Sequence, residues 1–397
     1  MNRRIFVKTS GLALFGTGAI PGWLARAAEG QKTRKKVLVT IFQRGAMDGL
    51  HAVVPYGDPR YKPLRPTLAI TDSLNLDGFF GLHPALAPLQ PIWDAKQLAI
   101  IEAVGSPDPT RSHFDAQDYM ESGTPGLKAT RDGWLNRALP ADAASPVRAV
   151  AVGPDLPRML RGKQPAVALN SVREFQVRDA MAAREFESSF ASSSMADLSR
   201  ETFEAVRILK SLPAADSKVT YPASRLGQSL KEIARLIKAD VGLEVAFADM
   251  GGWDTHVNEA PRLAQLLGEF GGALAAFWQD LGDRLDDVAV VTMSEFGRTA
   301  KENGSRGTDH GHANVMFAFG GGIQGGRIHG KWPGLAPENL HERRDLAVTT
   351  DFRTVLSPLV SSHLGNHAAN VFPGFTPEPF TLFGAAASQP TNGARRE

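Results

Sequence analysis

Short, uninterrupted apolar runs recur along the chain, separated by longer stretches in which apolar residues return every three to four positions. The runs are typical of strands buried on both faces, and the longer pattern is typical of amphipathic helices. Strands that alternate with helices predict an α/β fold with a mostly parallel central sheet and helices on both faces. We expect strands at Val37–Phe42, Leu98–Val104, Arg148–Val152, Leu243–Ala248, Val288–Met293 and Asn314–Phe319. We expect helices at Phe114–Met120, Met195–Leu212, Ser224–Ala239, Ala260–Leu285 and Asp351–Leu364, the last with Asp351 as its N-cap.

No fixed-period repeat and no change of composition divides the 397 residues, of which 43% are hydrophobic. This content can bury a large core, and we expect a single large domain over residues 28–385. The Pro-rich segment Tyr56–Pro66 is expected to be a loop, and the small polar residues 386–397 a flexible C-terminal tail.

The first 27 residues contain the three parts of a secretory signal peptide. Arg3 and Arg4 precede the uncharged stretch Gly11–Leu24, and Ala25–Ala27 is a small-x-small cleavage pattern. The arginine pair favours twin-arginine export, and the apolar stretch is shorter than the roughly 20 residues of a transmembrane helix. We therefore expect residues 1–27 to be removed after export through the twin-arginine translocon. The protein would then be periplasmic or secreted, without a stable transmembrane anchor.

Composition excludes several classes of function. The chain has no cysteine, which excludes disulfides, thiolate metal ligands and a cysteine nucleophile. Its formal charge of +2 becomes −2 once the four basic residues of segment 1–27 are removed, so no charge pattern favours nucleic acid binding. The sequence also lacks the G-x-S-x-G elbow of serine esterases and a dinucleotide-binding fingerprint.

Ligands of an open α/β sheet bind beyond the carboxyl ends of its strands, so the polar residues next to each apolar run are candidates for a site. Asp48 follows the first run between two glycines, where it fits a turn or a crevice-facing acid. Thr110, Arg111 and Ser112 follow the second run, at the start of a predicted helix. A hydroxyl there can act as a nucleophile and an arginine can hold an anion, although Ser112 also fits a plain N-cap.

Metal-ligand residue types accompany the later runs: Asp249, Asp254 and His256, then Glu295 with Arg298, then Asp309, His310 and His312. Carboxylate and imidazole groups suit Zn²⁺ or a similar divalent ion, and the alternative for each cluster is a hydrogen-bonded turn. Their order at the strand ends is the pattern of a metal-assisted ester hydrolase.

Six segments carry a family resemblance: Arg44–Leu50, Leu82–Leu86, Thr110–Phe114, Gly251–His256, Ser294–Arg298 and Thr308–His312. Over nearly the whole mature chain, the sequence resembles a bacterial family of twin-arginine-exported proteins of uncharacterised function. That family is placed in the alkaline-phosphatase and sulfatase-like superfamily. The resemblance implies an alkaline-phosphatase-like fold with one or two divalent ions (Zn, Ca or Mg) and a nucleophilic hydroxyl.

By position, the resemblance assigns Asp48 to the first metal-binding acid. Ser112, or alternatively Thr110, would be the nucleophile. Arg111 or Arg298 would hold the anion of the substrate.

The remaining ligands are implied in the same way. Asp249 or Asp254 would form an Asp–His ligand pair with His256, and His310 or His312 would be the late histidine.

The chain departs from the superfamily at two places. Glu295-Phe296 stands where the superfamily has Asp-His, so either Asp309-His310 supplies a replacement or one metal is lost. In the sulfatase activation motif, Pro107 would occupy the modified position, and a proline cannot be converted to formylglycine.

We therefore expect an exported, metal-dependent hydrolase that acts on a small-molecule or glycan phosphate or sulfate ester. The alternative is a non-catalytic binding or assembly protein of the cell envelope on the same fold.

Overall fold

The computed structural model describes residues 34–140, 145–171, 205, 207, 208, 212 and 217–384. The expected signal peptide, the expected tail and almost all of the expected helix Met195–Leu212 lie outside these residues. The described residues from Lys35 onward form one compact unit.

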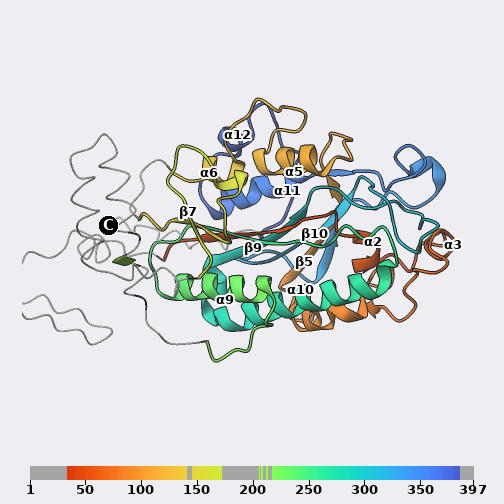
Figure 1. The fold of residues 1–397 in the computed structure, drawn as a ribbon, viewed down its shortest axis with the longest axis horizontal. Coiled ribbons are helices and arrows are strands. Elements are labelled where there is room, and N and C mark those ends of the chain that lie inside the picture. Colours follow the sequence, from red (N-terminus) through yellow and green to blue (C-terminus); the bar gives the residue numbers. More distant parts are fainter. Residues whose placement is uncertain are drawn as a thin grey trace, which may run out of the picture. The chain divides into compact units, whose positions relative to one another are not determined.

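A mixed sheet of nine strands forms the centre of the described part of this unit (Figure 1). The strand order is β11-β5-β10-β9-β1-β8-β6-β7, with the short β12 also paired to β5. Strand β10 is antiparallel to its neighbours β5 and β9, and the other pairings of this sheet are parallel. The strands are β1 Val37–Gln43, β5 Leu98–Gly105, β6 Ala149–Val152, β7 Val167–Leu169, β8 Val245–Met250, β9 Val288–Ser294, β10 Asn314–Gly320, β11 Arg327–His329 and β12 Thr350–Asp351.

All six strands predicted from apolar runs are present, each within two residues of the expected bounds. Their runs are continuous because helices cover both faces of the sheet. In β1, alternate side chains enter two different cores: Val37, Val39 and Ile41 lie in one, and Leu38 and Phe42 in the other. The predicted α/β class, with a mostly parallel sheet between helices, is confirmed.

Two helical layers flank the sheet on opposite faces in Figure 1. The helices α9 Arg225–Lys238 and α10 Glu259–Leu281 cover one face, and α10 continues as the 3-10 turn η3 Gly282–Asp287. The other face carries α5 His113–Ser122, α6 Trp134–Arg137, α11 Phe352–Pro358 and α12 Ala368–Val371. Asp351 caps α11 as expected, since its carboxylate accepts from the Arg353 amide at 2.9 Å. The helix predicted to reach Leu364 changes instead to a π-turn, η5 Leu359–His363.

Smaller elements complete the described part. They are α2 Gly49–Ala52, α3 Tyr61–Leu64, α4 Gln90–Asp94, the 3-10 turns η1 Pro84–Leu89, η2 Arg158–Leu160 and η4 Pro337–Asn339, and a second sheet of β2 Val53–Val54, β4 Gly81–Leu82 and β3 Leu74–Asn75. The expectation of a loop throughout Tyr56–Pro66 is wrong at α3. Pro63 lies in the first turn, where its missing amide hydrogen breaks no bond, and Tyr61 is buried. None of the helices in the described residues has the length and apolarity needed to cross a membrane.

Candidate metal centre

The predicted polar segments meet at one edge of the sheet. Strand pairing places Gln43, the last residue of β1, beside Met250 of β8 and Ser294 of β9. The first residue of β10, Asn314, lies opposite Val104 near the end of β5. The loops that follow β1, β5, β8 and β9, and the loop that precedes β10, therefore emerge together.

Three imidazoles and one carboxylate converge in this region. The Oδ1 atom of Asp254 lies 2.9 Å from Nε2 of His256, 3.1 Å from Nε2 of His310 and 3.5 Å from Nε2 of His113. Nε2 of His310 is also 3.0 Å from Nε2 of His113 and 3.0 Å from Nε2 of His256. A tetrahedral ion with bonds of about 2.0 Å separates its ligand atoms by about 3.3 Å, close to these five spacings. The ligand atoms of His113, Asp254 and His310 all lie within 4.8 Å of one another.

The other ring nitrogen of each histidine contacts a hydrogen-bond acceptor. Nδ1 of His113 donates to Glu295 Oε1 at 2.8 Å, and Nδ1 of His256 donates to Asp309 Oδ1 at 3.1 Å. Nδ1 of His310 donates to the backbone carbonyl of Arg111 at 2.9 Å. A neutral imidazole that donates from Nδ1 carries a lone pair on Nε2. With all three rings in that tautomer, three lone pairs would point at one another and at a carboxylate oxygen, and a bound cation would stabilise this arrangement. Without a cation, the contact with Glu295 raises the pKa of His113.

Glu295 lies behind His113 instead of among the converging atoms. Its buried carboxylate accepts from the His113 ring, from the Gly45 amide at 2.8 Å and from the Gln117 side chain at 2.9 Å. Burial alone would raise the pKa of Glu295, but these donors outweigh it and lower the pKa below its usual value. Glu295 and Asp309, both expected as metal ligands, therefore orient histidines from the far side of the rings.

Arg298 fixes the carboxylate of Asp254. Its guanidinium donates to Asp254 Oδ1 at 2.6 Å, and its nitrogens also donate to the backbone carbonyls of Gly45, Ala46, Trp253 and Thr308. Burial disfavours the Asp254 carboxylate, but Arg298 outweighs it and lowers the pKa of Asp254 to about 2. Arg298, which was expected to hold a substrate anion, is 1% exposed, and its guanidinium is bonded to Asp254 and four backbone carbonyls.

Arg111 was expected to hold the substrate anion as well. Its guanidinium binds Asp345 at 2.6 Å and Glu342 at 2.6 Å. Its backbone carbonyl orients His310. The guanidinium of Arg111 is therefore held by two carboxylates, while its backbone contacts the converging group.

Asp48 does not join the converging group. Its carboxylate forms a buried two-bond ion pair with Arg65, at 2.5 and 3.1 Å. It also lies within a second buried group of ligand-type residues, with His51 and Glu259. Burial lowers the pKa of His51 to about 3.

Asp249 and His312, which were also expected as ligands, have other partners. Asp249 binds Arg44 at 2.8 Å and Arg225 at 3.2 Å. His312 is buried, and its Nε2 lies 3.0 Å from the carbonyl of Ser106.

The two hydroxyl candidates lie in the loop that leads to His113. Ser112 is the N-cap of α5, with Oγ 3.5 Å from the amide of Asp115, and it is exposed. Thr110 Oγ1 accepts from the Ser112 amide at 3.3 Å.

His113 belongs to the converging group but was not among the candidates predicted from the sequence, although it directly follows Ser112. The sequence does contain a signal for His113, which is a histidine in a loop next to a predicted strand. The same signal indicated His256 and His310.

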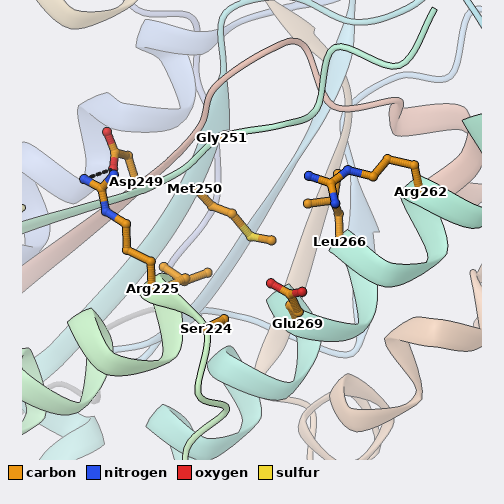
Figure 2. A pocket seen from close by; sticks show the side chains of 9 residues that line it. Ser224, Arg225, Asp249, Met250, Gly251, Arg262, Leu266 and Glu269 are labelled. Atoms are coloured by element: carbon orange, nitrogen blue, oxygen red, sulfur yellow. Dashed lines mark ion pairs between the residues drawn. The ribbon is translucent and has the colours of Figure 1, made fainter. Parts of the chain in front are cut away.

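A cavity of about 230 Å³ lies beside Gly251, at the end of β8 (Figure 2). Its lining residues come from the ends of α9 and β8 and from one side of α10: Ser224, Arg225, Leu226, Asp249, Met250, Gly251, Arg262, Leu266 and Glu269. Gly251 in the cavity wall precedes Asp254 by three residues along the chain.

Several solved structures have a similar fold. The periplasmic domain of EcEptC from Escherichia coli, in complex with Zn, is 9% identical at a TM-score of 0.36, with 72% of this chain and 73% of that chain covered. PsFucS1 sulfatase from Pseudoalteromonas sp. is 13% identical at a TM-score of 0.37, with 88% of this chain and 72% of that chain covered. A TAB5 alkaline phosphatase variant with Mg bound is 11% identical at a TM-score of 0.33, with 73% of this chain and 93% of that chain covered. At these values the likenesses carry no argument about activity.

No curated protein matches the chain. The family model described as "Protein of unknown function (DUF1501)" matches residues 96–371. This span makes up more than half of the chain and includes all four converging residues. The chain belongs to the DUF1501 family.

Proposed function

We propose that the protein is a metal-dependent hydrolase of phosphate or sulfate esters, with one ion bound by His113, His256, His310 and Asp254. The observation that carries this proposal is the convergence of three imidazole Nε2 atoms on one carboxylate oxygen, at 2.9 to 3.5 Å. Three imidazoles suit zinc better than calcium or magnesium, which prefer oxygen ligands.

The exposure of the centre favours catalysis. The side chains of Asp254 and His256 are 46% and 38% exposed, so a substrate can reach them. A bound zinc ion would polarise an ester oxygen and make a bound water more acidic. The chain itself supplies an exposed hydroxyl on Ser112, which directly precedes a ligand, and we propose this residue as the nucleophile with Thr110 as the alternative.

Metal content and hydrolysis test the proposal together. The wild type should contain about one zinc per chain by elemental mass spectrometry and should hydrolyse members of a panel of phosphate and sulfate esters. His113→Ala and His310→Ala should lose the metal and at least about 100-fold in kcat/KM. The exposed His367 provides the control, because His367→Ala removes an imidazole far along the chain from every proposed ligand. Full activity in metal-free wild type would refute the proposal.

One observation favours a second candidate, a non-catalytic envelope protein with a structural ion. All four donors come from the protein, and closed four-coordinate sites are typical of structural zinc. X-ray absorption at the zinc edge distinguishes the two. A shell of three nitrogens and one carboxylate oxygen that does not change with inorganic phosphate favours the structural role, and an additional exchangeable oxygen favours catalysis.

We also propose that residues 1–27 direct twin-arginine export to the periplasm. Folding before export would let the metal centre assemble in the cytoplasm. Lysine replacement of Arg3 and Arg4 should retain the uncleaved chain in the cytoplasm, and the mass of the exported wild type should begin at Ala28. Unchanged export of the double variant would contradict this route.

A further inference from the structure

An ester with an anionic group needs a cationic partner on the protein, and three arginines near the centre are already engaged. Arg298 donates to Asp254 and to four carbonyls, and Arg111 binds Asp345 and Glu342. Arg44 binds Asp249 and Glu121.

Arg262 on α10 differs from these arginines. Its only hydrogen bond among the described residues is a long contact, 3.3 Å, to the side-chain oxygen of Gln265, and no carboxylate pairs with it there. Its guanidinium lies against Gly252, where an added Cβ would be 2.8 Å from Arg262 Nη2. Gly252 also has φ of +96°, so glycine both permits the turn and leaves room for the guanidinium.

Because the guanidinium of Arg262 lies against Gly252, it is close to the proposed metal centre. One residue separates Gly252 from the proposed ligand Asp254, so their Cα atoms are at most about 7 Å apart. The guanidinium of Arg262 is therefore on the order of 10 Å from the converging atoms.

Figure 2 shows Arg262 at the edge of the cavity, with Met250 and Leu266 nearby on an apolar side. Across the cavity, Arg225 pairs with Asp249 at 3.2 Å. Glu269 also lines the cavity, two helical turns from Arg262 and about 10 Å farther along α10. Its carboxylate would repel an anion from the end of the cavity where Glu269 lies. The charges therefore favour an anion at the Arg262 end, beside the loop of Asp254.

We propose that this cavity is a substrate subsite in which Arg262 binds a second anionic group, separated from the reacting ester by a short apolar spacer. The substrate class is thus a phosphate or sulfate ester that carries a further carboxylate, phosphate or sulfate. This inference rests on the proposed metal-centred hydrolysis and specifies its substrate.

Binding of non-hydrolysable probes tests the subsite without turnover. Alkylphosphonates of four, six and eight carbons would be compared, by calorimetry on the zinc-loaded protein, with phosphonates of equal length that end in a carboxylate. A charge-assisted hydrogen bond should make the best carboxylate probe bind about 10-fold tighter than its methyl counterpart. In Arg262→Gln this ratio should fall to about 1, with unchanged affinity for the methyl probe.

Arg327 supplies the matched control. It is exposed on β11, five strand positions from β8 and thus roughly 24 Å away, so Arg327→Gln should keep the full ratio. Equal binding of both probe types to the wild type, or an unchanged ratio in Arg262→Gln, overturns the subsite and leaves the hydrolase proposal standing. If neither phosphonate binds the zinc-loaded protein, the metal-centred proposal fails and the subsite fails with it.

Discussion

Replacing Glu295 by glutamine isolates the contribution of a charge that lies behind the metal centre. Glu295 does not join the converging atoms, yet its buried carboxylate accepts from His113 Nδ1 at 2.8 Å. Glutamine keeps the shape and can still accept from the ring, but it removes the negative charge. Its carbonyl oxygen, in the place of Oε1, can also accept from Gly45 and Gln117, and its amide group, in the place of Oε2, would face the Ser294 hydroxyl.

The expected magnitude follows from the role of such partners. Loss of a group that orients a metal-bound histidine typically lowers metal affinity by 10- to 100-fold, or about 1.4 to 2.7 kcal/mol. The upper part of this range is expected for Glu295→Gln because Glu295 is 1% exposed. Asp309 holds His256 in the same way, but its side chain is 52% exposed, so Asp309→Asn should cost less than 10-fold.

Competition with a chromophoric zinc chelator would measure both affinities, and circular dichroism would show whether the variants are folded. Glu338→Gln, an exposed change on η4, should leave zinc affinity unchanged. A folded Glu295→Gln protein with affinity within about twofold of the wild type would refute the assignment of His113 as a ligand oriented by Glu295.

Three other variants test separate parts of the structure. Arg65→Met should leave the Asp48 carboxylate buried without its partner and cost about 3 to 5 kcal/mol in urea unfolding, and a loss below 1 kcal/mol would show that the ion pair is not buried as described. Gly45→Ala should weaken zinc binding, because Gly45 has φ of +113° and an added Cβ would lie 2.8 Å from the Asp254 amide; unchanged affinity would show that the Asp254 loop tolerates the shift. Burial lowers the pKa of His363 to about 4, whereas the unfolded value is about 6.5. The unfolded state therefore takes up the proton first, so this contribution to stability is complete above pH 6.5 and about 3 kcal/mol is lost as the pH falls to about 4. Urea unfolding of His363→Gln across this range should show a correspondingly flatter pH profile, and a profile parallel to that of the wild type would contradict the shift.

The fold was largely predictable because its strands are buried on both faces. Continuous apolar runs such as Val288–Met293 have no polar face that could obscure the pattern, and the parallel pairing follows from the helices between them. The short helix α3 was not predictable in the same way. Its stability depends on the burial of Tyr61 and on the pairing of Arg65 with Asp48, a contact between segments that no local pattern reports.

The candidate site was predictable to the level of loops. Residue order at strand ends was sufficient to bring Asp254, His256 and His310 to one edge of the sheet. The sequence could not predict which atoms face one another. Glu295 and Asp309 are residue types that bind metals, but in the structure they contact Nδ1 of His113 and Nδ1 of His256, on the side of each ring away from the converging atoms. The sequence does not single out His113, because the hydroxyls of Thr110 and Ser112 account for the same loop without it.

Crystallographic anomalous scattering at the zinc edge, on protein purified after export, would test the central claim most directly. The account predicts one strong peak about 2 Å from Nε2 of His113, His256 and His310 and from Oδ1 of Asp254. No peak at this position in zinc-supplemented crystals, with the three rings hydrogen-bonded to one another or to water, would contradict it.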